Sequence, residues 1–177
     1  MKDDLVLLVV GSGGREFAVA KKLKESPHVK TVYCAPGNVG MQTIGVETVP
    51  IEETDLDGLL EFAKNKKVDW TFVGPENVLC AGITDKFNEA GQKIFGPNQR
   101  AAQLEGSKDY ALRFMSKYNI PTARYETYAS AETCIAGLKN FDYPVVIKED
   151  GLAGGKGVTI AQNQDVAEET IREMFAG

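Results

Sequence analysis

Short runs of apolar residues alternate with amphipathic stretches along the chain. Residues 5–10 are apolar at every position, which is typical of a parallel strand that is covered on both faces. A glycine cluster at 11–14 ends this run, and Phe17 and Ala20 then lie at helical spacing. Strands and helices alternate in this way as far as Pro97. The pattern predicts βα units that form a parallel sheet, and therefore an α/β fold.

The same pattern predicts the remaining elements. Up to Pro97 we expect strands near 30–35, 46–49, 68–73 and 93–95, and helices from Gly14 to before Pro27, over 55–65 and from Asn77 to about Ala90. A mostly helical stretch follows at 101–119, broken at Gly106, with Ser107 as the expected cap of its second piece. Beyond Pro121 we expect strands at 123–128, 143–148 and 157–161 and helices at 132–139 and 165–175.

These elements group into three parts. A βα domain is expected over residues 1–97, a helical linker over 98–121 and a smaller α+β domain over 122–177. The composition, with 43% hydrophobic and 25% charged residues, is that of an ordinary globular protein.

Charge and hydropathy narrow the class of ligand. Twenty Lys and Arg against 25 Asp and Glu give a net charge of −5, which disfavours a surface for nucleic acid or anionic lipid. The longest apolar run, 5–10, is too short to span a membrane, and Lys2, Asp3 and Asp4 before it do not resemble a secretion signal. We expect a cytoplasmic protein that binds small molecules.

The cysteines and the single histidine do not form a metal motif. Cys34, Cys80 and Cys134 lie far apart in the sequence, and His28 is the sole histidine, so no zinc-finger spacing exists. No histidine is placed to activate a thiol, and we therefore interpret the cysteines as core or half-buried residues. His28, next to a proline, is expected at the surface.

Three loops follow predicted strands, at 11–14, 36–40 and 74–77. The carboxyl ends of parallel strands share one edge of a sheet, so one site is expected there. Glycines 11, 13 and 14 before a helix favour a phosphate. The dinucleotide fingerprint fails, because Glu16 replaces its last glycine and residues 34–36 offer no acid for a ribose.

The other residues of these loops allow two interpretations each. Arg15 and Glu16 are expected to pair with a phosphate and a hydroxyl respectively, or to form a solvated first turn. Gly37 and Gly40 serve either a ligand or a simple turn. The segment 75–76 is either part of the site or only a strand exit.

A second glycine-rich segment, 151–157, resembles a P-loop superficially. Asp150 stands where a P-loop needs its first glycine, and Gly157 stands where it needs a Ser or Thr for magnesium. The β-branched residues that follow, 158–160, favour a strand rather than a helix. The segment therefore predicts a glycine-rich hairpin, with Lys148 at the end of the strand before it.

Together these motifs resemble one family. They are GSGGRE at 11–16, APGNVG at 35–40, VGPE at 73–76, IFGP at 94–97, AAQLEGSK at 101–108, IPTA at 120–123 and VIKEDGLAGGKGV at 146–158. In order and spacing they closely resemble the phosphoribosylamine–glycine ligase family, ATP-grasp enzymes of purine biosynthesis. The resemblance runs from Leu5 to the end of the chain.

The resemblance implies the fold and two binding sites. The first domain would be Rossmann-like (the pre-ATP-grasp domain) and bind 5-phosphoribosylamine through Gly11, Gly13, Gly14, Arg15, Glu16, Gly37, Asn38, Gly40, Pro75 and Glu76. The second would be the small ATP-grasp subdomain and bind ATP through Lys108, Lys148, Gly154, Gly155, Lys156 and Gly157. Taken without the resemblance, Lys108 is equally well explained as a helix-surface charge. Lys148 by itself is better explained as a strand-end lysine that reaches into water, but the glycine-rich segment beside it favours a phosphate contact. A flexible turn without a ligand is the less favoured interpretation of the glycines.

The resemblance also implies the reaction. Glycine would be phosphorylated by ATP and joined to 5-phosphoribosylamine, with Mg²⁺ bridging the phosphates. The family's magnesium ligands are expected beyond residue 177, so we expect no metal ligand and no assignable catalytic residue here, and no activity from this chain alone. The alternatives are another ATP-grasp ligase and a non-catalytic nucleotide-binding module.

Four positions depart from the family pattern. Phe17 stands where the family usually has histidine, and Glu149 and Gly154 stand where it usually has alanine. The family commonly has Pro-Leu where this chain has residues 78–79, Val-Leu. An acid beside a phosphate loop is expected to disfavour ATP.

Overall fold

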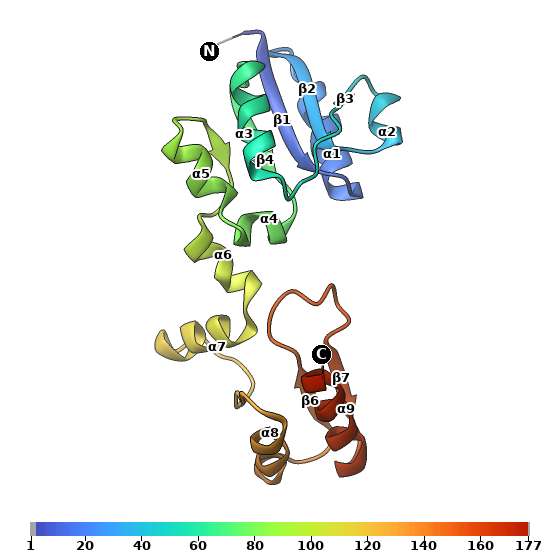
Figure 1. Ribbon diagram of the computed structural model, residues 1–177, viewed down its shortest axis with the longest axis vertical. Helices are drawn as coiled ribbons and strands as arrows, with labels where there is room; N and C mark the ends of the chain where they lie inside the picture. The colour runs from blue at the N-terminus through green and yellow to red at the C-terminus, as the bar shows by residue number, and fades with distance from the viewer. Residues whose placement is uncertain (1–2, 177) are drawn as a thin grey trace. The chain divides into compact units, whose positions relative to one another are not determined.

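The structure is a computed structural model that describes residues 3–176 (Figure 1). The chain divides between Gln103 and Leu104 into two units, which we call unit 1 and unit 2. The division falls inside the stretch that the sequence analysis assigns to a linker, and the three-part division at 97/98 and 121/122 stays a prediction. Within residues 3–176, no helix is both long enough and apolar enough to cross a membrane.

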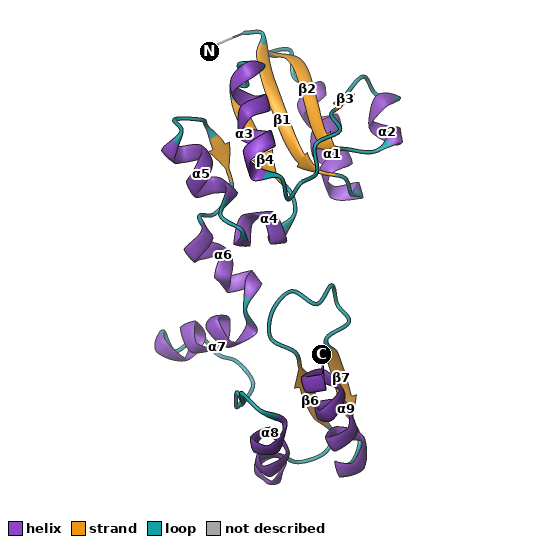
Figure 2. Ribbon diagram, in the orientation of Figure 1, coloured by secondary structure: helices purple, strands orange, loops and turns teal. Residues whose placement is uncertain are grey.

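Unit 1 is built on a five-stranded parallel sheet in the order β3-β2-β1-β4-β5, with helices on both faces (Figure 2). This confirms the predicted α/β fold. The strands are β1 (Leu5–Gly11), β2 (Val29–Pro36), β3 (Glu47–Thr48), β4 (Trp70–Val73) and β5 (Ile94–Phe95). The helices are α1 (Gly14–Lys24), α2 (Val39–Gln42), α3 (Leu56–Asn65), α4 (Glu76–Cys80), α5 (Ile83–Glu89) and α6 (Gln99–Gly106), which continues across the division.

The continuous apolar run of β1 is explained by its place in the middle of the sheet. Successive side chains of a strand point to opposite faces. Leu8 packs in a fully buried cluster with Leu59 of α3 and Phe87 of α5. Val9 packs in a second cluster with Ala20 of α1. Both faces of β1 are therefore covered, as the sequence predicts.

The helix expected from Asn77 to Ala90 is two helices, and this prediction was wrong. α4 ends at Cys80, and α5 begins at Ile83. Gly82 between them has φ +93°, a left-handed conformation that interrupts the helical hydrogen bonds. The break turns the chain so that Val78 and Ile83 both enter the first core cluster.

Unit 2 combines helices with a small antiparallel sheet. Its elements are α7 (Lys108–Lys117), α8 (Ala131–Gly137), a 3₁₀ turn (Leu138–Asn140), β6 (Val145–Lys148), β7 (Val158–Ala161) and α9 (Gln164–Ala176). One face of the sheet packs on α8 and α9 through Ile147, Ala161 and Ile171. Ser107 caps α7 by accepting a hydrogen bond from the amide of Tyr110 at 3.1 Å, as predicted.

The strand expected at 123–128 does not form, and this prediction was also wrong. Among the described residues of unit 2, only β6 and β7 form a sheet. Residues 121–127 are mostly exposed, and the Tyr128 hydroxyl donates to Glu126 two positions away. A strand needs a neighbouring strand for its backbone groups, and within residues 3–176 none pairs with this segment.

Candidate functional site

The three loops that follow β1, β2 and β4 meet at one edge of the sheet, as the sequence predicts. The amide of Gly37 donates to the carbonyl of Gly11 at 3.1 Å. The side-chain amide of Asn38 donates to the carbonyl of Ser12 at 2.8 Å. The amide of Gly74 donates to the carbonyl of Val10 at 3.1 Å, so the loop after β4 is anchored beside that of β1. The first two loops are thus linked directly, and the third lies next to them.

Glu16 is buried among these loops, with 3% of its surface exposed. One carboxylate oxygen accepts from the amide of Gly13 at 2.8 Å, and the other accepts from Nε of Arg15 at 2.7 Å. Glu16 is the third residue of α1, and its bond to the residue that precedes the helix is half of a capping box. The interpretation as a solvated first turn therefore does not hold for Glu16.

Three glycines make room for this carboxyl group. A Cβ added at Gly11 would lie 2.7 Å from Cγ of Glu16, one at Gly13 would lie 2.9 Å from its Oε2, and one at Gly74 would lie 2.0 Å from its Oε1. A Cβ at Gly14 would meet no atom within 4 Å. Gly14 is thus the glycine of the first loop that faces open space.

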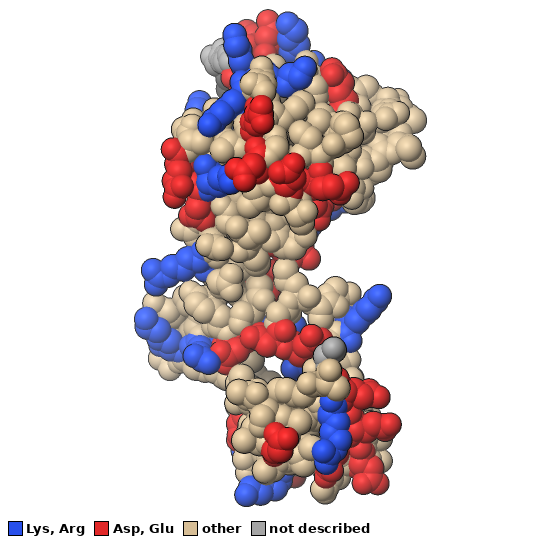
Figure 3. Space-filling view, in the orientation of Figure 1, with Lys and Arg blue, Asp and Glu red and all other residues tan. Residues whose placement is uncertain are grey.

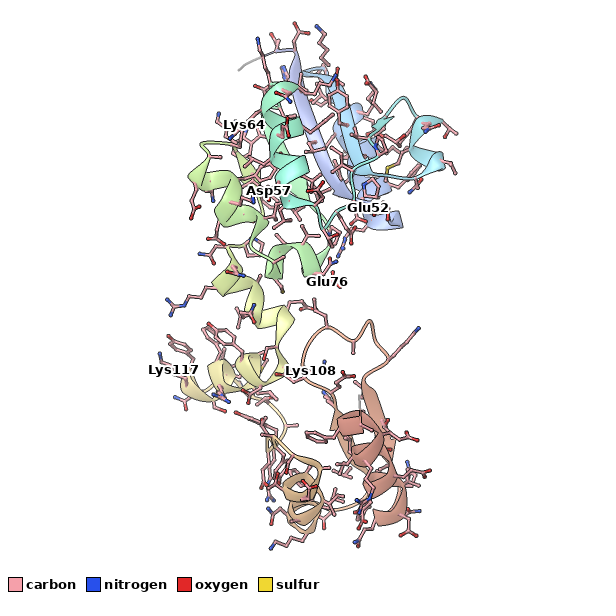
Figure 4. All side chains as sticks on the ribbon, viewed as in Figure 1. Glu52, Asp57, Lys64, Glu76, Lys108 and Lys117 are labelled. Carbon is pink, nitrogen blue, oxygen red and sulfur yellow. The ribbon has the colours of Figure 1, made fainter. Side chains whose placement is uncertain are left out.

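Arg15 and Glu76 lie on the rim of the site. The Arg15 side chain is 57% exposed, and its terminal nitrogen lies 3.5 Å from a carboxylate oxygen of Glu76, which stands at the start of α4 (Figure 4). The hydrogen bond from Arg15 to Glu16 raises the pKa of the guanidinium further, so it stays charged. The site therefore presents one fixed cation next to an accessible carboxylate.

The predicted turn at 36–40 begins the short helix α2. Asn38 caps it, since its side-chain oxygen accepts from the amide of Met41 at 3.3 Å. The ring of Phe17 lies 3.5 Å from the place where a Cβ at Gly40 would stand. Pro75 packs near Gly11, where an added Cβ would lie 2.9 Å from its ring. All ten residues assigned from the resemblance to the first site lie on these three loops or the helix turns that follow them.

The first cysteine and the histidine lie outside any reactive arrangement. Cys34 is fully buried, and its thiol donates to the carbonyl of Gly11 at 3.3 Å. Burial, with the charge of Glu16 adding to it, raises the pKa of Cys34 to about 12. His28 is partly exposed and lies 2.6 Å from a carboxylate oxygen of Asp3. Both placements agree with the sequence interpretation.

In unit 2, Lys148 ends β6 on the face of the sheet that does not pack on the helices. Its neighbour across the sheet is Val158, and Val146 and Ile160 form the next pair on the same face. These three apolar side chains are about half exposed. The alternation along β6 contains this signal, but the sequence analysis did not use it. The exposed face offers an apolar platform that ends in a lysine.

Asp150 joins the glycine segment to the start of α7. Its carboxylate accepts from the amide of Lys108 at 2.7 Å, from the amide of Asp109 at 3.2 Å and from the hydroxyl of Ser107 at 3.1 Å. The side chain of Lys108 (Figure 4) adds a second link between the same two segments, because its Nζ donates to the carbonyl of Gly151 at 2.8 Å. Sequence reasoning missed this role of Asp150, since the partners lie about 40 residues apart.

Four groups that donate hydrogen bonds to Asp150 lower the pKa of its carboxyl group. Partial burial raises the pKa of Asp150, but the bonds from the amide of Asp109, the hydroxyl of Ser107 and the amides of Gly151 and Lys108 outweigh this effect. The pKa therefore lies below its ordinary value. The negative charge of Asp150 faces the positive end of the α7 dipole.

The segment 151–157 is a glycine-rich hairpin, as predicted, whose tip at 154–156 is exposed and whose last residue, Gly157, is buried. Gly151, Gly154 and Gly155 have positive φ angles of 96°, 55° and 79°, and a Cβ on any of them would meet no atom within 4 Å. The amide of Glu149 donates to the carbonyl of Gly157 at 2.8 Å, which closes the base of the hairpin. The amide of Lys156 donates to the carbonyl of Ala153 at 2.9 Å inside it.

Family models match both units of the chain. The family model of the phosphoribosylglycinamide synthetase N domain matches residues 5–105, and that of the ATP-grasp (A) domain of the same family matches residues 106–177. The chain belongs to the phosphoribosylglycinamide synthetase family. The resemblance that the sequence motifs indicate is thereby confirmed.

Curated relatives in this family are similar over almost the whole chain. The chain is 50% identical to the phosphoribosylamine–glycine ligase of Lactococcus lactis over 171 residues, which are 97% of this chain and 42% of that protein. It is 49% identical to the ligase of the same name from Escherichia coli over 172 residues, 97% of this chain and 40% of that protein. The chain thus spans about two-fifths of the length of these relatives.

Solved structures agree with this assignment. The phosphoribosylamine–glycine ligase of Thermotoga maritima superposes with a TM-score of 0.73 at 32% identity, over 97% of this chain and 39% of that one. The biotin carboxylase domain of the Hydrogenobacter thermophilus 2-oxoglutarate carboxylase superposes with a TM-score of 0.78 at 14% identity, over 99% of this chain and 41% of that one. The second likeness shows the fold alone.

Two further properties bear on possible ligands: the distribution of surface charge and the grouping of metal-binding residue types. On the face shown in Figure 3, basic and acidic side chains are interspersed over both units. Within the part of the chain that the structure describes, no three His, Cys, Asp or Glu residues are grouped so that they would hold a metal ion.

Proposed function

We propose that this chain takes part in the ATP-dependent ligation of glycine to 5-phosphoribosylamine, which gives glycinamide ribonucleotide, ADP and phosphate. The observation that carries the proposal is the match of two consecutive domains of one family across residues 5–177, with about 50% identity to phosphoribosylamine–glycine ligases. The geometry of each unit supports one binding site, for 5-phosphoribosylamine in unit 1 and for ATP in unit 2.

The edge of the sheet in unit 1 suits a ribose phosphate. The first-turn amides of α1, including those of Gly14 and Arg15, have no acceptor within the helix, and the helix dipole favours an anion there. Arg15 adds a guanidinium that matches phosphate geometry. Asn38 and Glu76 on the neighbouring loops provide amide and carboxylate groups for sugar hydroxyls or the amine. Gly11, Gly13, Gly37, Gly40 and Pro75 shape the backbone around this site.

The exposed face of the sheet in unit 2 suits a nucleotide. Val146, Val158 and Ile160 offer an apolar surface for a base, and Lys148 stands at its end, beside the glycine-rich hairpin. A lysine on a long stem follows phosphate oxygens as a point charge. Gly154, Gly155, Lys156 and Gly157 would cover the phosphates, and Lys108 would approach them from the start of α7. Asp150 does not compete for Lys148, because its carboxylate is bonded to α7.

In the proposed reaction the carboxylate of glycine takes the terminal phosphoryl group of ATP, and ADP leaves. The amine nitrogen of 5-phosphoribosylamine then bonds to the acyl carbon and loses a proton, while the bond from that carbon to the phosphate oxygen breaks and phosphate departs. Arg15 and Lys148 would neutralise the phosphates of the two substrates. Magnesium would supply further neutralisation, but the described residues do not group into a metal site by themselves.

Two titrations test this proposal on the 177-residue chain. Ribose 5-phosphate and ATP are each titrated calorimetrically into the unmodified chain, into Gly14→Val and into Lys148→Met. A Cβ at Gly13 would strike Glu16, whereas Gly14 faces open space, so Gly14 is the position that tests phosphate approach alone. We expect Gly14→Val to weaken ribose 5-phosphate and leave ATP unchanged.

Lys148→Met is expected to show the opposite selectivity. Loss of one charge-assisted hydrogen bond weakens ATP by about 10- to 150-fold. Lys139→Met, at another exposed lysine of unit 2, is the matched control and should change neither ligand. Equal affinity of the unmodified chain and Lys148→Met for ATP, or the absence of any ribose 5-phosphate binding, would contradict the proposal.

A further inference from the structure

Glu16 is the most completely enclosed charged group among the described residues of unit 1. Its side chain is 4% exposed, while the side chain of its partner Arg15 is 57% exposed. The resemblance assigns Glu16 to the ligand, but both of its carboxylate oxygens already accept a hydrogen bond from the protein. A carboxylate has about four acceptor sites, so two remain, but a side chain that is only 4% exposed gives a substrate hydroxyl little access to them.

The surroundings of Glu16 are built to keep it in place. Gly11 ends β1, Gly13 precedes α1 and Gly74 follows β4, and a Cβ on any of them would come within 3 Å of the Glu16 side chain. Three glycines, two from the loop 11–14 and one from the loop 74–77, thus leave a space that this carboxyl group fills. Two of the three converging loops are therefore packed against one side chain.

The hydrogen bond that Arg15 donates to Glu16 holds the guanidinium group in place. An arginine side chain that is free in solution loses rotamer freedom when it binds a phosphate. Here Nε of Arg15 is held by Glu16 at 2.7 Å, and its terminal nitrogen lies 3.5 Å from Glu76. The guanidinium is thus held before any ligand arrives, which lowers the entropic cost of binding.

From these contacts we infer that Glu16 is a positioning residue, which holds Arg15 in the geometry that the phosphate site requires, and that it does not contact substrate. This inference rests on the proposed phosphate site of unit 1. It reassigns Glu16 from ligand binding to the support of Arg15. It also explains Gly11 and Gly74 as residues that accommodate Glu16.

A double-mutant cycle on ribose 5-phosphate affinity tests the inference. Arg15→Ala alone should weaken binding by about 10- to 150-fold, since a charged hydrogen bond is lost. Glu16→Ala alone should weaken it by about 2- to 12-fold, the range that ordering one long side chain is worth. In the Arg15→Ala background, Glu16→Ala should cause almost no further loss, because the residue through which it acts is gone.

An NMR signal of Arg15 tests the role of Glu16 without any ligand. The Nε–H resonance of Arg15 in the ¹H–¹⁵N NMR spectrum should be sharp and protected from exchange in the unmodified chain. It should be lost in Glu16→Ala and weakened in Glu16→Gln, which keeps the shape of the side chain and one acceptor oxygen. Glu25→Ala, at an exposed glutamate paired with Lys22 at the other end of α1, is the control and should change neither the signal nor the affinity.

Two results would overturn the inference. One is an equal loss of affinity from Glu16→Ala with and without Arg15, which would mean that Glu16 contacts the ligand directly. The other is an Arg15 signal that does not change in Glu16→Ala, which removes both acceptor oxygens. If the unmodified chain bound no ribose 5-phosphate, the proposed function would fail, whereas the Arg15 signal would still decide the role of Glu16.

Discussion

Replacement of Asp150 by alanine is expected to loosen the start of α7 without unfolding unit 2. The substitution removes an acceptor from the amides of Lys108 and Asp109, which lie 2.7 and 3.2 Å from one carboxylate oxygen. The hydroxyl of Ser107, at 3.1 Å, loses the same partner. Ser107 still caps the amide of Tyr110, so the helix keeps one of its two capping side chains.

The magnitude follows from the number of capping bonds that are lost. A helix N-cap is worth about 0.5–2 kcal/mol, and an acid at the positive end of the dipole about 0.3–1 kcal/mol. Because these two effects overlap and Asp150 is exposed, we expect a local loss of about 1–2 kcal/mol. That loss corresponds to about a 5- to 30-fold change in the local opening equilibrium.

Residue-resolved hydrogen exchange measures this change directly. The amides of Lys108 and Asp109 should exchange about 5- to 30-fold faster in Asp150→Ala at neutral pH, with a smaller increase in Asp150→Asn. Asp142→Ala, at an exposed aspartate of the same unit, is the control and should leave both rates unchanged. Unchanged exchange of both amides in Asp150→Ala would refute the proposed capping role.

The same cap is expected to depend on pH. The folded-state pKa of Asp150 lies below its unfolded value, so its contribution to stability is present above the unfolded pKa of about 4 and is lost as the pH falls through the folded pKa. The extra protection of Lys108 and Asp109 should therefore persist from neutral pH to about pH 5 and disappear in stronger acid. In Asp150→Asn the protection, corrected for the intrinsic rate of exchange, should not change over this range.

Two further predictions concern unit 1. Gly74→Ala should lower the free energy of unfolding by about 1–3 kcal/mol, because its Cβ would strike Oε1 of Glu16. In the Glu16→Ala background the same substitution should cost much less, and additive losses in urea titrations would show that Glu16 does not fill this space. Cys34, whose pKa burial raises to about 12, should not react with iodoacetamide at pH 8 in the folded chain and should react after unfolding in urea. Mass spectrometry of the alkylated peptides checks this, and modification of Cys34 without unfolding would contradict its burial.

Local sequence patterns predict the parallel sheet of unit 1 and the edge of the sheet at which its candidate site lies. The apolar run of β1, the glycines that end it and the helical spacing that follows are local signals. A short apolar run bounded by glycines is typical of a strand covered on both faces, and apolar residues at helical spacing form the buried face of a helix. The meeting of the three loops also followed from sequence, since parallel strands end at one edge. The cap at Ser107 is equally local, with its partner three residues away.

The roles of individual side chains at these places depend on contacts that form only in the folded chain. Glu16 looked like an exposed first-turn residue or a ligand group, and only the approach of Gly74 from a distant strand shows that it is enclosed. Asp150 bonds to amides about 40 residues away, and the segment 123–128 has a suitable pattern but no neighbouring strand. Propensity and periodicity act within a few residues, whereas burial and long-range hydrogen bonds depend on which segments the completed fold brings together.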